Sequence, residues 1–348
     1  VWTSLGIDPL PFERAQMHKG FSNNNAAYQL YLIGRYQMTN RSSENLRKSI
    51  ETFTRAVEKD QSFALGYVGL ADAYALLNLY DIEPPKDAYP KAYENTAKAL
   101  NIDYDLADAH ASLAYIKFYH QRDRPGAELE FRRSIQMNPS YAQAHHWFAL
   151  ALAGMNRPVE ALTEAQTAQR LDPQSAAIKS ATAIVYFMSG RNDDALAECD
   201  KALALSEGFV PALKVKRWTY SEMNAREEAN EAFQKELSYS GGKITDPGWQ
   251  VVQMQIASPN TNREENLKRL ADATNVEPVR GNDYTFAFEI AIAYNNLGEP
   301  EKALDWLERA ESANSHSFSY INVEPRLANL RDVPRFQRLT RKFDQGGN

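Results

Sequence analysis

The chain is poor in the features on which secreted domains, redox proteins and membrane spans depend. Its 348 residues contain a single cysteine, Cys199, which excludes an intramolecular disulfide and any CxxC site. No stretch approaches the roughly 18 consecutive apolar residues that a membrane-crossing helix needs. The chain starts at Val1 without a methionine and without a signal-peptide pattern, so we expect an upstream element such as a targeting peptide, an anchor or another domain.

A basic surface is also missing. The formal net charge is −6, from 39 Lys and Arg against 45 Asp and Glu. Because phosphate binding needs clustered positive charge, we do not expect nucleic-acid binding by this region. The arginine-rich stretch 335–342 is interpreted as one solvated helix face. A hydrophobic content of 43% with 24% charged residues is typical of a folded chain.

Catalytic signatures are absent as well. The sequence has no GxGxxG, no Walker-type loop, no HExxH and no GxSxG. Among its histidines, His110, His120 and His146 could converge on a metal ion across neighbouring helices. The simpler interpretation is that each is a packed or exposed histidine. We therefore predict a chain that is not an enzyme and has neither metal nor cofactor, with the metal site as the competing hypothesis.

What the sequence does contain is a repeat. Ala127, Ala161, Ala195 and Ala229 follow one another at intervals of 34 residues. Each interval contains two helical patterns around a turn. A fixed period of this length is typical of a solenoid whose units contact only their neighbours. The predicted fold class is all-α, a superhelical solenoid of antiparallel helix pairs with about eight units, one of them degenerate.

Aligned periods carry small residues at three places, as close helix crossings require. Gly, Ala or Ser occupies 19 of the 21 aligned positions. The first-helix place holds Gly34, Ala71, Ala114, Ala149, Ala183, Arg217 and Ala291, and the two second-helix places hold Ser49, Ala92, Ala127, Ala161, Ala195, Ala229 and Ala303, and Ala56, Ala99, Ser134, Ala168, Ala202, Glu236 and Ala310. Both exceptions, Arg217 and Glu236, fall in the sixth unit. Together with the Gly241-Gly242 turn, they predict that a kink or hinge lies there.

The same register divides the chain into five parts. Residues 1–25 are predicted to be a lead-in segment with a short helix near residues 12–19, and residues 26–242 to form units one to six. Residues 243–280 are predicted to be the degenerate hairpin, with helices at 249–257 and 263–274. Residues 281–314 should be the last regular unit. Residues 315–348 should cap the array, with a loop over 315–322 and one or two short helices over 325–343.

These recurring residues resemble the tetratricopeptide repeat family. The pattern is carried by Gly34, Tyr74, Ala161, Pro173, Tyr186, Ala195, Tyr294, Gly298 and Ala303. The resemblance covers about residues 26–312 and implies a right-handed superhelix whose first helices line a concave groove. A finer likeness is to arrays in bacterial multidomain regulators, where they follow winged-helix, serine/threonine kinase or cyclase-like domains. It is carried by the segments AYQLYLIGRY, GLADAYALL, AHHWFALAL and PRFQRLTRKF.

The resemblance also implies a binding surface. In this family the second, fifth, ninth and twelfth residues of each first helix face the groove, where aromatic side chains would anchor a peptide. We expect a partner to contact Tyr28, Tyr31, Arg35, Asp72, Tyr115, Phe118, His146, Ile184, Phe187, Lys214 and Trp218. The alternative is that the apolar members only pack against neighbouring helices. A carboxylate clamp, as in chaperone-binding members, is not expected, because the fifth and ninth places are mostly apolar.

The leading functional hypothesis is a non-catalytic scaffold that binds a protein or peptide in its groove, as the sensory or partner-binding arm of a bacterial regulator. The alternative is a structural subunit or assembly factor of a larger complex, possibly attached to a membrane, that uses the convex face and the ends. A cytoplasmic location and an extracytoplasmic one behind an upstream anchor are compatible with both hypotheses. The residues define no oligomeric state.

Overall fold

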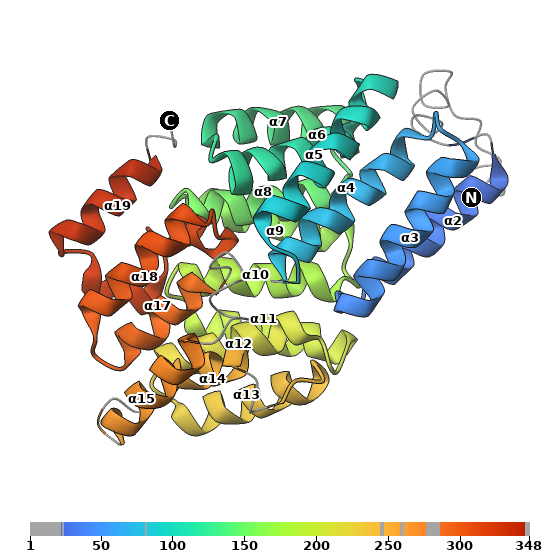
Figure 1. Cartoon of the computed structure of the whole chain (residues 1–348). Coiled ribbons are helices and arrows are strands. Elements are labelled where there is room, and N and C mark those ends of the chain that lie inside the picture. Colours follow the sequence, from blue (N-terminus) through green and yellow to red (C-terminus); the bar gives the residue numbers. More distant parts are fainter. Residues whose placement is uncertain are drawn as a thin grey trace.

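The chain folds into a curved stack of antiparallel helix pairs (Figure 1). The computed structural model describes residues 22, 24–80, 82–243, 247–257, 260, 262–275 and 286–344, and the helix predicted near residues 12–19 lies outside them. The pairs are α2 (Asn25–Met38) with α3 (Ser43–Lys59), α4 (Ala64–Leu79) with α5 (Pro85–Ile102), α6 (Ala107–Ile116) with α7 (Arg124–Met137), α8 (Ala142–Gly154) with α9 (Pro158–Leu171), α10 (Ala176–Met188) with α11 (Asn192–Leu205), α12 (Val210–Glu222) with α13 (Arg226–Tyr239), α14 (Pro247–Met254) with α15 (Arg263–Thr274), and α17 (Ala287–Asn296) with α18 (Pro300–Ser312).

Small residues lie at the helix crossings, as the sequence predicts. All 21 aligned places are buried, and Ala161, Ala195 and Ala303 are fully so. At Gly34 a Cβ atom would lie 2.5 Å from the Phe53 ring, so only glycine permits this approach between α2 and α3. Close crossings bury the apolar stripe of each helix against its partner, and the pairs stack into the right-handed superhelical solenoid expected from the sequence.

The turn inside each pair repeats one backbone conformation. Arg122, Asn156, Gly190 and Asn224 are spaced 34 residues apart and have φ values of 56°, 59°, 71° and 57°. Gly298, with φ of 74°, follows α17 in the same way. Asparagine and glycine tolerate this left-handed conformation well. Arg122 instead ends the π-helical turn η2 (Lys117–Gln121), which extends α6.

The two exceptions to the small-residue pattern pair with each other. Arg217 Nε donates to Glu236 Oε2 at 2.7 Å, and the two side chains are 0% and 4% exposed. Arg217 Nη1 donates to Gln255 Oε1 at 2.8 Å, and Gln255 Nε2 donates to Glu289 Oε2 at 2.6 Å. This buried polar chain joins α12 and α13 to the turn after α14 and to α17. The predicted hinge therefore coincides with a connected hydrogen-bond network.

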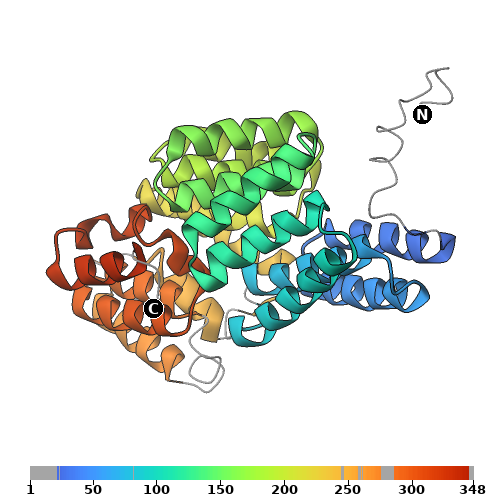
Figure 2. The same cartoon turned by 90° about the horizontal axis from the view of Figure 1, so that it is seen from above.

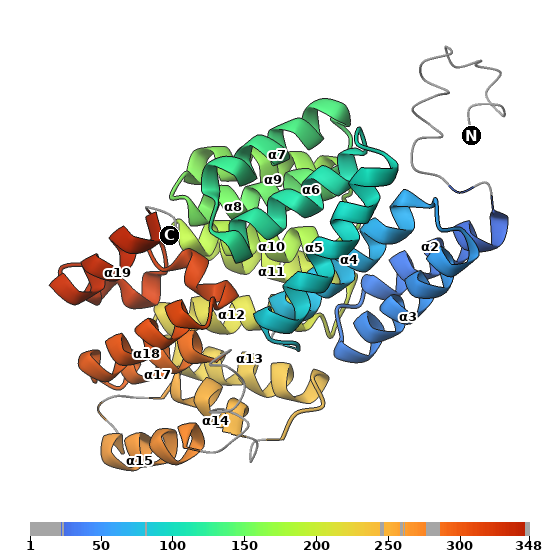
Figure 3. The ribbon, with the colours of Figure 1, turned by 45° about the horizontal axis from the view of Figure 1, so that its top comes forward.

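The chain beyond α18 returns to the inner side of the array. Residues 315–322 were expected to form a loop, but they contain the 3₁₀ helix η3 (His316–Tyr320), because Phe318 and Tyr320 are drawn into the core. The 3₁₀ helix η4 (Pro325–Leu330) and α19 (Pro334–Asp344) follow. Figures 2 and 3 show this end of the chain, in red, beside the green helices of the middle units. We call residues 313–330 the C-terminal segment.

Replacing Arg217 by alanine should lower the free energy of unfolding by about 3–5 kcal/mol, because Glu236 would remain as a buried, unpaired carboxylate. In the double variant Arg217→Ala, Glu236→Ala, both places regain the small residue of the other units, so most of the loss should be recovered. Guanidinium denaturation followed by circular dichroism measures both changes. Glu228→Ala, on the exposed face of α13, is the control. A double variant no more stable than the single one would contradict this account.

Candidate functional site on the inner surface

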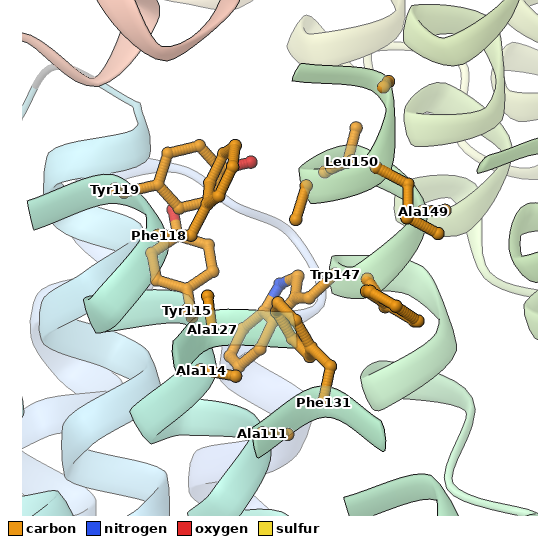
Figure 4. Packing of buried hydrophobic residues seen from close by; sticks show 14 of the residues in the cluster. Ala111, Ala114, Tyr115, Phe118, Tyr119, Ala127, Phe131, Trp147, Ala149 and Leu150 are labelled. Carbon is orange, nitrogen blue, oxygen red and sulfur yellow. The ribbon is translucent and has the colours of Figure 1, made fainter. Parts of the chain in front are cut away.

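The first helices α4, α6, α8, α10 and α12 pack side by side and form the inner surface of the array. The eleven residues predicted to contact a partner divide into two groups there. Tyr31, Asp72, Tyr115, Phe118, His146 and Phe187 are buried. Tyr28, Arg35, Ile184, Lys214 and Trp218 are partly exposed. Figure 4 shows Tyr115 packed beside Trp147, and Phe118 beside Tyr119, within the core. That these eleven residues bind a partner remains a prediction.

The chain itself covers the middle of the inner surface. The hydroxyl groups of Tyr119 and Tyr320 are hydrogen-bonded at 2.6 Å. The His316 ring stacks on Tyr119 with ring centroids 4.0 Å apart. From the end of η2, Arg122 donates to the Glu311 carbonyl at 2.7 Å and to Asn314 Oδ1 at 2.9 Å. The end of α18 and the C-terminal segment therefore occupy the place where the sequence predicts an external ligand.

Arg326 of η4 covers the next part of the inner surface. Its guanidinium lies 4.7 Å from the Trp218 ring centroid and 5.8 Å from that of Phe187. Arg326 donates to the Glu324 carboxylate through two hydrogen bonds, from Nε to Oε1 at 2.7 Å and from Nη2 to Oε2 at 2.9 Å. Two of the predicted aromatic anchors are thus in contact with an arginine of the same chain.

Towards the N-terminal end, the inner surface carries a polar cluster. Arg35 Nη1 lies 3.5 Å from Asp72 Oδ2, and the Ser112 hydroxyl donates to Asp72 Oδ1 at 2.6 Å. Burial raises the pKa of Asp72 to about 6, although the charge of Arg35 and the Ser112 hydrogen bond act in the opposite direction. Arg35 therefore has a carboxylate partner within the chain.

The three histidines of the metal hypothesis have separate partners. His110 bonds through Nδ1 to Glu130 at 2.7 Å and through Nε2 to the Tyr104 carbonyl at 2.8 Å. His120 stacks on the Tyr89 ring with centroids 4.7 Å apart. Burial lowers the pKa of His146 to about 3, and the charge of Arg41 adds to this. Within the described ranges, no three His, Cys, Asp or Glu side chains are placed to hold a metal ion.

Two cavities lie beside the C-terminal segment, and sequence reasoning missed both. The larger, of about 490 Å³, is lined by Ser221, Glu222, Asn224, Gln255, Ile292, Asn295, Asn296, Pro325, Arg326, Ala328 and Asn329. The smaller, of about 370 Å³, shares Glu222, Pro325 and Ala328 with it. The lining residues come from distant parts of the chain and follow no repeat. Only the left-handed turn residues Asn156, Gly190 and Asn224, which border the two cavities, could have been anticipated from the period.

The fold and this inner surface define a helical-repeat protein. Residues 146–208 match the family model for the tetratricopeptide repeat. The helix pairs on either side of the match continue the same repeat, so the chain has the fold of a tetratricopeptide repeat array. In the described part of the chain, no helix combines the length and the apolar character that crossing a membrane would need.

Among curated proteins, the chain is similar to the transcriptional regulator HilA of Salmonella paratyphi A and of Salmonella typhimurium. The identity is 23% over 210 residues, which covers 60% of this chain and 38% of HilA. The chain thus spans well under half the length of these relatives.

Among solved structures, the chain is similar to Cut9 with Hcn1 from an APC/C hetero-tetramer. The TM-score is 0.57 and the identity 15%, with coverage of 95% of this chain and 59% of the other. An IFIT1 monomeric mutant with Gppp-AAAA gives a TM-score of 0.54, 15% identity and coverage of 78% and 68%. Identities this low show a shared fold alone.

Acid should weaken the docking of the C-terminal segment. Burial, and then the charge of Lys214, lower the pKa of His316 from 6.5 to about 3. Below pH 6.5 an undocked His316 takes up a proton that the docked ring cannot, so its contribution to stability is complete above that pH and declines between pH 6.5 and 3. At a pH of about 5.5 the loss is about 1.4 kcal/mol.

The measurement is the free energy of unfolding at a pH of about 7.5 and of about 5.5, for wild type and His316→Gln. Between these two pH values, the free energy of unfolding should fall less in the glutamine variant than in wild type, whatever the variant's stability at the higher pH. His146 is retained in both proteins, so its own titration cancels in the comparison. Equal losses in the two proteins would show that His316 is not held neutral.

Proposed function

We propose that this chain is the partner-binding arm of a bacterial regulatory protein and that it holds a polypeptide against its first helix, α2. Tetratricopeptide arrays are in general non-catalytic scaffolds for protein interaction, and we propose the same role here. The similarity to HilA supports the regulatory part of the proposal. The observation that carries the binding part is an exposed stripe on α2.

The α2 stripe consists of Tyr28, Leu32, Arg35 and Tyr36. Their spacing of i, i+4, i+7 and i+8 places them on one face of the helix. Leu32 is 48% exposed and Tyr36 is 77% exposed, while Tyr28 and Arg35 are partly exposed. In the later first helix α8, by contrast, the large apolar side chains Trp147, Phe148, Leu150 and Leu152 are all buried. An exposed apolar stripe with a cationic side chain is a surface on which an amphipathic polypeptide can pack.

Two of the residues predicted from the sequence, Tyr28 and Arg35, belong to this stripe. The proposal therefore moves the partner from the middle of the inner surface, which the C-terminal segment occupies, to its N-terminal edge. Phe187→Ala would test the fold rather than binding, because Phe187 is fully buried.

A photo-crosslinking amino acid placed at Leu32 or Tyr36 of the full-length protein in its own cells should give a discrete adduct with a partner polypeptide. The same amino acid at Val159, which is 78% exposed on the second helix α9, is the matched control and should give none. Mass spectrometry of the adduct identifies the partner.

The charge variant Leu32→Glu, Tyr36→Glu should then weaken binding of that partner by about tenfold or more, because it places carboxylates in an apolar contact. Isothermal titration with the purified partner gives the number, and Val159→Glu should leave the affinity unchanged. Adducts from Val159 but not from α2 would reject the α2 stripe. They would favour the structural-subunit alternative, for which the exposed Leu129 and Val159 of the second helices are the supporting observation.

A further inference from the structure

Arg326 and Glu222 line the larger of the two cavities, and each carries a polar group without a hydrogen-bond partner among the described residues. The Arg326 side chain is only 7% exposed, and its Nη1 atom is buried without a hydrogen-bond partner, whereas Nε and Nη2 are bound to Glu324. Glu222 lines the same cavity from the end of α12. Among the described residues, nothing donates a hydrogen bond to its carboxylate or forms an ion pair with it. A buried donor without an acceptor is costly unless a ligand completes it.

The guanidinium of Arg326 is neutralised within the described part of the chain, whereas the carboxylate of Glu222 is not. Glu324 neutralises Arg326, so Nη1 offers a directed hydrogen bond rather than an excess charge. Burial raises the pKa of Glu222, and Arg326 and Arg331 offset this only in part. A half-buried carboxylate with a raised pKa is stabilised in its charged form by a cation bound against it.

The remaining walls are polar and held in place. Asn295 Nδ2 donates to Asn329 Oδ1 at 2.8 Å, and Asn329 Nδ2 donates back to Asn295 Oδ1 at 3.0 Å. Asn296 Nδ2 donates to the Ala257 carbonyl at 2.8 Å. None of the described residues that line the cavity carries an aromatic ring. A volume of about 490 Å³ is within the range of small-molecule sites, and this lining favours a small polar ligand over an apolar one.

We propose that this cavity binds a small zwitterion of the α-amino acid class, with its ammonium group against Glu222 and its carboxylate on Nη1 of Arg326. A zwitterion places an ammonium group against Glu222 and an acceptor on Arg326, whereas a lone cation leaves the Arg326 donor unsatisfied and a lone anion is repelled by Glu222. Because Glu222 lies on α12 and Arg326 on η4, the bound molecule connects the sixth unit to the C-terminal segment. The site is separate from the α2 stripe and does not depend on the polypeptide partner.

The test titrates the full chain with each standard amino acid, up to a concentration of about 10 mM, by calorimetry and thermal melting. Glucose, butylamine and acetate serve as neutral, cationic and anionic probes. At least one amino acid should bind saturably and raise the melting temperature, and no probe should match it. Glu222→Gln should weaken that binding about tenfold or more while the unliganded melting temperature changes little, because none of the described residues forms a hydrogen bond or an ion pair with Glu222.

Glu207→Gln, at an exposed position outside the cavity, is the matched control and should bind as wild type does. Chemical-shift changes at Ile292 and at the Asn224 side chain would place the ligand in the cavity. The proposal is overturned if no amino acid binds in this range, if binding survives Glu222→Gln undiminished, or if one of the three probes binds better than every amino acid.

Discussion

The structure depends on close contact between helices at small residues that recur every 34 positions. Ala161 and Ala195 are fully buried at such crossings, and Gly34 lets the Phe53 ring lie against its backbone. A single pair cannot bury its apolar faces, so each unit is stable only against its neighbours. The contact therefore fixes the direction in which the chain grows. It also places the large residues of the first helices on one inner surface, where they must be covered by a ligand or by the chain itself.

The sixth unit is where the chain stops repeating and turns back. Arg217 and Glu236 fill the two places that are small elsewhere, and their charges cannot be buried without partners. The hydrogen bonds from Arg217 to Gln255 and from Gln255 to Glu289 supply those partners and draw the degenerate hairpin and the last pair against α12. From that position the C-terminal segment lies beside η2 of the third unit. One departure from the period thus accompanies the change from an open array to one whose inner surface is occupied.

The local and periodic features were predictable from the sequence, whereas long-range closure was not. The sequence predicts a helix at residues 263–274, and α15 has the same bounds, because helical periodicity depends on residues only a few positions apart. Tyr119 and Tyr320 are 201 residues apart, and no spacing rule connects them. The sequence pattern of an aromatic residue at a groove position does not depend on whether a partner or the chain's own tyrosine covers that residue. The cavity beside Glu222 escaped prediction for the same reason, because it exists only after η4 has docked against α12.

Docking of the C-terminal segment and occupation of the larger cavity share one residue. Arg326 lies over Trp218 and Phe187 and also lines the cavity, so the cavity is complete only when η4 is docked. A ligand that binds this state alone must favour docking by its own binding free energy, and docking must favour the ligand equally. The α2 stripe lies at the opposite end of the array, and none of its residues lines the cavity. The two ends can therefore be tested independently, and any coupling between them would have to pass through the stacked first helices that the 34-residue contact holds together.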